Sequence, residues 1–109
     1  MILTSERAEK LFNSDYIKKI YPMIDKIDVD VDWDGDEEFP FYVLRITVKL
    51  NDSTITSKNM YEKKFDPHYL YEEHLKYLLQ FLNINRNTAT IQQVYIEILG
   101  PDGEIVYYY

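Results

Sequence analysis

The chain of 109 residues has no cysteine, only three glycines and a single tryptophan. Without cysteine it has no disulfide scaffold, no cysteine-ligated zinc and no thiol nucleophile. Three scattered glycines do not form a loop that cradles phosphates. No apolar run approaches the ~20 residues of a membrane helix, and the N-terminus lacks the basic start and apolar stretch of a secretory signal. We therefore expect a cytoplasmic protein without a cofactor.

What the chain does contain is typical of a folded domain. It is 46% hydrophobic and 16% aromatic, and its length suits one domain, residues 1–109, with its own core. We find no repeat, linker or low-complexity tract. The abundance of Ile, Lys, Asn and Tyr favours an AT-rich genome and hence a bacterial, archaeal or phage source.

The net charge of −7 is concentrated in one segment. Between positions 27 and 44 there are seven acidic residues and no basic one: Asp28, Asp30, Asp32, Asp34, Asp36, Glu37 and Glu38. The other twelve acids are balanced by twelve bases. A domain this acidic repels nucleic acid and anionic membranes. Any partner that is attracted by charge should therefore be basic.

Hydrophobic periodicity predicts the order α(α)βββαββ. The apolar spacing changes phase near Asn13, which predicts two short helices or one bent helix. The helical segment should end near Pro22, because the residue before a proline avoids the helical region. Strict alternation then predicts a strand with Asp28, Asp30, Asp32 and Asp34 outward and Val29, Val31 and Trp33 buried. Further strands are expected at 41–50, 54–65, 91–99 and 104–109. This pattern favours an α+β domain with an antiparallel sheet of about five strands and helices on one face.

The best predicted helix spans 67–82. Asp66 can cap it and Pro67 suits its first position. Its expected core stripe is Tyr71, Leu75, Leu78 and Leu82. His68 and His74 are six residues apart, so they do not share a face as paired metal ligands would.

The acidic segment also resembles the first half of a calcium loop. Asp30 to Gly35 reads D-x-D-x-D-G, which would make the ligands Asp30, Asp32, Asp34, Asp36 and Glu38. The twelfth position is Phe41 where a bidentate Glu is needed. The alternation also favours a straight strand, which does not curl around an ion.

A second interpretation is that the segment imitates nucleic acid. Same-face residues of a strand are ~6.6 Å apart, close to the separation of phosphates along a DNA backbone. A row of carboxylates with this spacing would suit a basic partner. The plain alternative is a solvated face that keeps the sheet soluble and blunts an edge strand.

The C-terminal tyrosines form another candidate surface. Neighbouring strand residues point to opposite faces, so Tyr107, Tyr108 and Tyr109 cannot all be buried. Tyrosine is enriched in interface hot spots. An exposed aromatic edge would favour self-pairing or a partner, and the alternative is a strand inside the sheet.

The leading hypothesis is a non-enzymatic inhibitor or immunity-type protein that blocks a basic site of a nuclease or another nucleic-acid-acting protein. At the level of fold alone, the chain is similar to phage inhibitors that mimic DNA, to immunity proteins and to secretion chaperones. The alternatives are a homodimeric chaperone-like or scaffold domain and a small calcium-binding module. We do not expect an enzyme, because no nucleophile–base pair or metal quartet is visible. The expected partner-binding residues are Asp28, Asp30, Asp32, Asp34, Asp36, Glu37, Glu38, Tyr107 and Tyr109.

Overall fold

Two short helices precede the sheet, as the change of phase near Asn13 predicts. The computed structural model describes residues 3–35, 38, 40–82 and 90–108, with α1 at Ser5–Phe12 and α2 at Asp15–Ile20. Thr4 caps α1, because its side chain accepts a hydrogen bond from the Arg7 N–H. The two helices bury apolar side chains from one face each: Ala8, Phe12 and Ile17.

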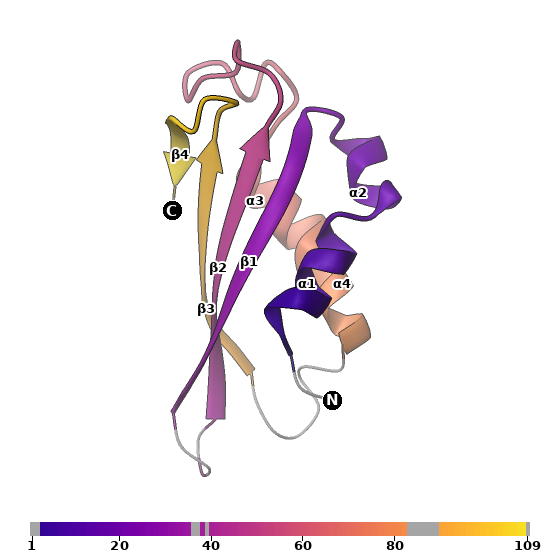
Figure 1. Cartoon of the computed structure of the whole chain (residues 1–109), viewed down its shortest axis with the longest axis vertical. Coiled ribbons are helices and arrows are strands. Elements are labelled where there is room, and N and C mark those ends of the chain that lie inside the picture. The colour runs from indigo at the N-terminus through magenta and orange to yellow at the C-terminus, as the bar shows by residue number, and fades with distance from the viewer. Residues whose placement is uncertain (1–2, 36–37, 39, 83–89, 109) are drawn as a thin grey trace.

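The described strands form one sheet in the order β1-β2-β3-β4. These strands are β1 (Ile24–Gly35), β2 (Pro40–Leu50), β3 (Thr90–Leu99) and β4 (Ile105–Tyr108). β1 and β4 pair antiparallel with their neighbours, whereas β2 and β3 are parallel. The helices lie together on one side of the sheet (Figure 1). The α+β class is therefore confirmed, but the prediction of about five antiparallel strands is wrong.

The error comes from residues 54–65, which form successive turns instead of a strand. The Asp52 carboxylate accepts hydrogen bonds from the N–H and hydroxyl of Thr54, and Asn59 bonds to the backbone of Thr54 and Thr56. Such local side-chain bonds compete with a strand ladder. Without a strand here, the helical segment is the crossover from β2 to β3, and a crossover connection makes two strands parallel.

The crossover helix begins where the sequence predicts. The Asp66 side chain accepts hydrogen bonds from the N–H groups of the next turn, as an N-cap does. The segment is not one regular α-helix, because it runs through α3 (Pro67–Leu70), the π-helical turn η1 (Tyr71–Leu75), α4 (Lys76–Leu79) and the 3-10 turn η2 (Gln80–Leu82). A π turn holds an extra residue, which shifts the apolar stripe. Leu79 is consequently buried, whereas Leu78 of the predicted stripe is only half-buried.

The core lies between the helices and one face of the sheet. Side chains of β1, β2 and β3 that alternate inward are almost fully buried, among them Ile27, Leu44, Ile46, Val48, Ile96 and Ile98. The far parts of β1 and β2 extend past the helices (Figure 1), and the molecule measures 46 × 24 × 20 Å. Val31 is therefore half-buried and Trp33 is 54% exposed. The prediction of a buried Trp33 is wrong, because no described helix reaches that part of the hairpin.

Candidate functional site

The acidic row lies on the sheet face that the helices do not cover. Asp28, Asp30 and Asp32 are exposed, while Ile27 and Val29, which alternate with them, point to the core. β1 is also an edge strand of the sheet. The expectation that these three carboxylates project from one face is thus confirmed.

Basic residues on the same face reduce the charge of the row. The ammonium group of Lys26 lies 3.1 Å from the Asp28 carboxylate, and Arg45 Nε lies 3.7 Å from that of Asp32. The hydrogen bond with Asp28 raises the pKa of Lys26. Asp30 is directly opposite Arg45 in the β1–β2 register. These pairs are exposed, so they contribute little to stability, but they make the row less acidic than the sequence indicates.

The rest of the acidic segment comprises Asp34, near the end of β1, and the acids between β1 and β2 in the sequence. The side chain of Asp34, and residues Asp36 and Glu37, lie outside the described part of the chain, whereas Glu38 is exposed. β1 continues in register with β2 as far as Gly35. The D-x-D-x-D-G pattern is therefore strand over its described length. Among the described residues, no three His, Cys, Asp or Glu side chains are grouped to hold a metal ion.

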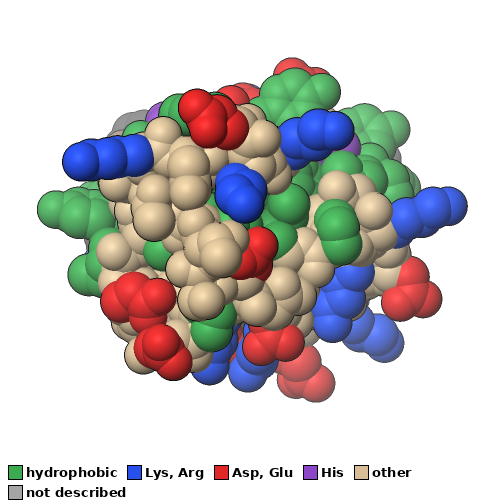
Figure 2. All heavy atoms as spheres, turned by 90° about the horizontal axis from the view of Figure 1, so that it is seen from above, with side chains coloured by type: hydrophobic (Ala, Val, Ile, Leu, Met, Phe, Trp, Pro, Cys, Tyr) green, Lys and Arg blue, Asp and Glu red, His purple; other side chains and the backbone are tan. Residues whose placement is uncertain are grey.

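The end of the molecule opposite the β1–β2 connection differs from the acidic segment in its charge. Figure 2 shows acidic and basic side chains interspersed there, with apolar ones between them. This mixture agrees with the cancelling charges outside positions 27–44. The acidic segment is thus the distinctive charged feature that the sequence identifies.

Helix α1 and its C-cap residue Asn13 cap the free backbone edge of β1 with three polar side chains. The N–H groups of Ile27, Val29 and Val31 donate to Asn13 Oδ1 (2.8 Å), Glu9 Oε1 (2.8 Å) and Ser5 Oγ (3.1 Å). Asn13 also donates to the Ile27 carbonyl at 2.7 Å. Four residues of a helix advance ~6.0 Å along its axis, and two residues of a strand advance ~6.6 Å. Side chains four residues apart on the helix therefore stay level with N–H groups two residues apart on β1 over three successive hydrogen bonds.

Sequence reasoning missed this cap. Ser5, Glu9 and Asn13 are four residues apart, so they share one face of a helix. That spacing was the available signal. The spacing alone does not identify the backbone groups that these side chains contact, and Asn13 is also typical of a turn.

The C-terminal strand is short and lies at the other edge of the sheet. Tyr108 is opposite Glu97 and is 71% exposed on the uncovered face, whereas Tyr107 is opposite Ile98 and contacts His68, with Tyr Oη 3.3 Å from His Nε2. The expected outward residue Tyr107 therefore faces the helices, and Tyr108 takes its place. Tyr109 lies outside the described residues. The alternative of a strand inside the sheet is wrong.

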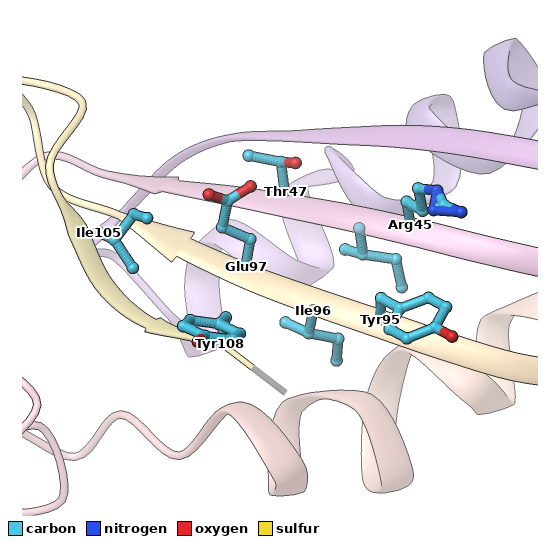
Figure 3. Close-up of a pocket in the computed structure, with 8 residues that line it drawn as sticks. Arg45, Thr47, Tyr95, Ile96, Glu97, Ile105 and Tyr108 are labelled. Atoms are coloured by element: carbon cyan, nitrogen blue, oxygen red, sulfur yellow. The ribbon is translucent and has the colours of Figure 1, made fainter.

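A shallow hollow of about 560 Å³ adjoins Tyr108 on the uncovered face (Figure 3). The Arg45 guanidinium lies over the Tyr95 ring, 5.4 Å from its centroid. Glu97 and Thr47 line the hollow beside these residues, and Ile105 closes it from β4. The hollow is amphipathic, with aromatic and aliphatic walls and charges of both signs.

On the helical side, three tyrosine rings surround the half-buried His74. The rings of Tyr16, Tyr21 and Tyr69 lie edge-to-face with the imidazole, with centroids 5.5 to 5.8 Å from its own, and the Tyr16 hydroxyl is 3.0 Å from His74 Nδ1. Burial raises the pKa of Tyr21 to about 12. The cluster packs α2 against the crossover helix.

Comparisons with protein-family models, curated proteins and solved structures found no match for this chain. Within the described residues, no helix has the length and apolar character to cross a membrane.

Proposed function

We propose that this chain is a non-enzymatic protein-binding module of the inhibitor or immunity type. In this proposal it covers a basic site of a nuclease or another nucleic-acid-acting protein. The observation that supports it most directly is the row of exposed carboxylates, Asp28, Asp30 and Asp32, on a sheet face without helices.

The row suits such a partner because of its spacing and its support. Same-face positions on a strand repeat every ~6.6 Å, which is comparable to the path between successive phosphates. The three bonds from α1 hold the backbone of β1 in place, so little ordering is needed on binding. Lys26 and Arg45 would exchange their present carboxylate contacts for contacts with the partner or with water.

The carboxylates would act mainly on the rate of association. Exposed charges steer a partner of opposite sign and each adds about 1 kcal/mol or less at an interface rim. Blocking the partner would then follow from occupying the surface on which its nucleic acid normally lies.

The test compares the wild type with a triple variant that carries Asp28→Asn, Asp30→Asn and Asp32→Asn. Partners are captured from a bacterial lysate, and the activity of the captured nucleic-acid-acting protein is then assayed. We expect the wild type to inhibit that protein, and the triple variant to associate more slowly and with a flatter dependence on salt.

A matched control changes three exposed acids elsewhere, Glu62→Gln, Glu73→Gln and Asp102→Asn. It makes the same change in net charge, so it separates the position of the charge from its amount. The proposal is wrong if both variants inhibit equally, because the row would then be only a solubilising face.

A second candidate is a homodimeric chaperone-like or scaffold domain that pairs through β4. The exposed Tyr108 on an edge strand, with the hollow beside it, favours this candidate. An aromatic dimer should persist at high salt, whereas an electrostatic complex weakens steeply, so sedimentation over a salt series separates the two.

A further inference from the structure

The uncovered face of the sheet contains an arginine that already lies between an aromatic ring and a carboxylate. The guanidinium carbon of Arg45 is 5.4 Å from the centroid of the Tyr95 ring, and its Nε is 3.7 Å from the Asp32 carboxylate. The three side chains come from the adjacent strands β2, β3 and β1. The flat side of an aromatic ring attracts a cation, and a carboxylate pairs with the same group. This trio is an internal example of how a ring and a carboxylate on this face bind a guanidinium.

The same two groups recur at the other end of the hollow, without a cation. Figure 3 shows Arg45 and Tyr95 at one end and Ile105 and Tyr108 at the other. Tyr108 of β4 is directly opposite Glu97 of β3, and opposed residues of an antiparallel pair have Cβ atoms about 4.5–5.5 Å apart. Within the described part of the chain, no Lys, Arg or His side chain forms an ion pair with Glu97 or lies over the Tyr108 ring. The second pair is therefore an unfilled counterpart of the first.

The walls around Glu97 leave room for a side chain from outside. The hollow of about 560 Å³ is within the range of about 300–1,000 Å³ that is usual for ligand pockets. Tyr108 is 71% exposed, and Ile105, which is 60% exposed, forms an apolar wall beside it. Thr47 is opposite Glu97 on β2, where its hydroxyl offers a second acceptor. Lys49 is exposed on the same face and forms no described ion pair with Glu97. A long apolar stem with a flat cationic end is complementary to these walls.

We propose that Glu97 and Tyr108 form a binding site for an arginine side chain of a basic protein partner. The guanidinium would lie over the Tyr108 ring and pair with the Glu97 carboxylate, as Arg45 does with Tyr95 and Asp32. Arginine fits better than lysine, because its planar group stacks on an aromatic face and is more weakly hydrated. The acidic row lies on the same face, so a basic partner that it attracts would meet this site. The inference rests on the proposed function, to which it adds the group of the partner that is bound.

The probes for this site are two labelled peptides with blocked ends and equal length, one of arginine and glycine and one of lysine and glycine. They are titrated at the same ionic strength, and we expect the arginine peptide to bind about threefold or more tightly. In NMR spectra of the wild type, the arginine peptide should shift the amide signals of β4 and of the facing part of β3 more than those of the helices.

Two variants separate the ring from the carboxylate. Tyr108→Leu keeps an apolar side chain but removes the aromatic face, so it should weaken the arginine peptide about threefold and remove its advantage over lysine. Glu97→Gln keeps the shape and removes the charge, so it should weaken both peptides about threefold. The matched controls are Tyr77→Leu and Glu73→Gln, at an exposed tyrosine and an exposed acid of the crossover helix. They should leave both affinities unchanged.

Equal affinities of the wild type for the two peptides, or unchanged affinities in both site variants, would overturn the inference. If the three Asp→Asn substitutions weaken both peptides while Tyr108→Leu and Glu97→Gln weaken neither, the arginine site is wrong and the acidic row stands. If the two site variants weaken binding and the three substitutions do not, the arginine site stands and the proposed role of the acidic row is wrong.

Sedimentation tests a second copy of the chain as the occupant of the hollow. We expect Tyr108→Leu to leave the oligomeric state of the protein unchanged. If Tyr108→Leu instead abolishes a dimer and leaves the affinity for the arginine peptide unchanged, the hollow is a dimer surface and the inference is wrong.

Discussion

The two halves of β1 have the same alternating sequence but different surroundings. In the first half, Ile27 and Val29 are buried by the helices, and α1 caps the backbone edge. In the second half, Val31 is half-buried and Trp33 is exposed. The bond from the Val31 N–H to Ser5 is the last of the three in the cap. Alternation determines which face a residue occupies, but only a covering element makes that face a core.

The first half should therefore tolerate substitution far less well than the second. Ile27 is fully buried, so Ile27→Ala removes apolar contacts and leaves a cavity. We expect a loss of about 2–5 kcal/mol in the free energy of unfolding, measured by urea denaturation. Val31→Ala, at a half-buried position in the second half of β1, should cost less. Similar losses from the two variants would contradict the comparison.

The cap from α1 is the next largest expected effect. Asn13→Ala leaves the N–H and C=O of Ile27 without their side-chain partner, in a partly buried position. We expect a loss of about 2–3 kcal/mol in the free energy of unfolding. Asn13→Asp keeps the acceptor but not the donor, so its loss should be smaller. If Asn13→Ala left the free energy of unfolding unchanged, water would have replaced both hydrogen bonds.

The second half of β1 should respond only weakly. Trp33→Ala removes one edge-to-face contact with Tyr42 and part of a buried surface, so we expect a loss of about 1–2 kcal/mol in the free energy of unfolding. Thermal unfolding followed by far-UV circular dichroism measures this loss. A loss as large as that of Ile27→Ala would show that Trp33 belongs to the core.

The acidic row should matter least for folding. Replacing Asp28, Asp30 and Asp32 together by Asn removes two exposed ion pairs and also relieves repulsion along the row. These effects oppose each other, so we expect a change within about 0.5 kcal/mol. The same variant should lower the pKa of Lys26, which an NMR titration detects, because its hydrogen bond with the Asp28 carboxylate raises that pKa.

Features that depend on neighbours along the chain were predictable. The break between α1 and α2, the cap at Asp66 and the outward direction of Asp28, Asp30 and Asp32 follow from spacing and local chemistry. The exposed face of the candidate site was therefore identified, though its role stays a prediction.

Features that depend on distant partners were not predictable. The turns of 54–65 were also missed, although their bonds are local: the weak apolar pattern there resembles a strand, but Asp52 and Asn59 hold the backbone in turns. The exposure of Trp33 depends on how far the helices reach, and the direction of Tyr107 depends on the register between β3 and β4. Neither quantity is encoded in a short stretch of sequence.

The matched repeats of α1 and β1 also bear on the order in which the chain folds. The bonds from Asn13, Glu9 and Ser5 span 14, 20 and 26 residues, so each closes a loop only slightly longer than the one before it. β2 and β3 join across a much longer stretch, since Arg45 is opposite Tyr95. We expect α1 and the β1–β2 hairpin to associate early in folding. Asn13→Ala should therefore slow folding, whereas Ile96→Ala should mainly speed unfolding, and stopped-flow kinetics would measure both rates.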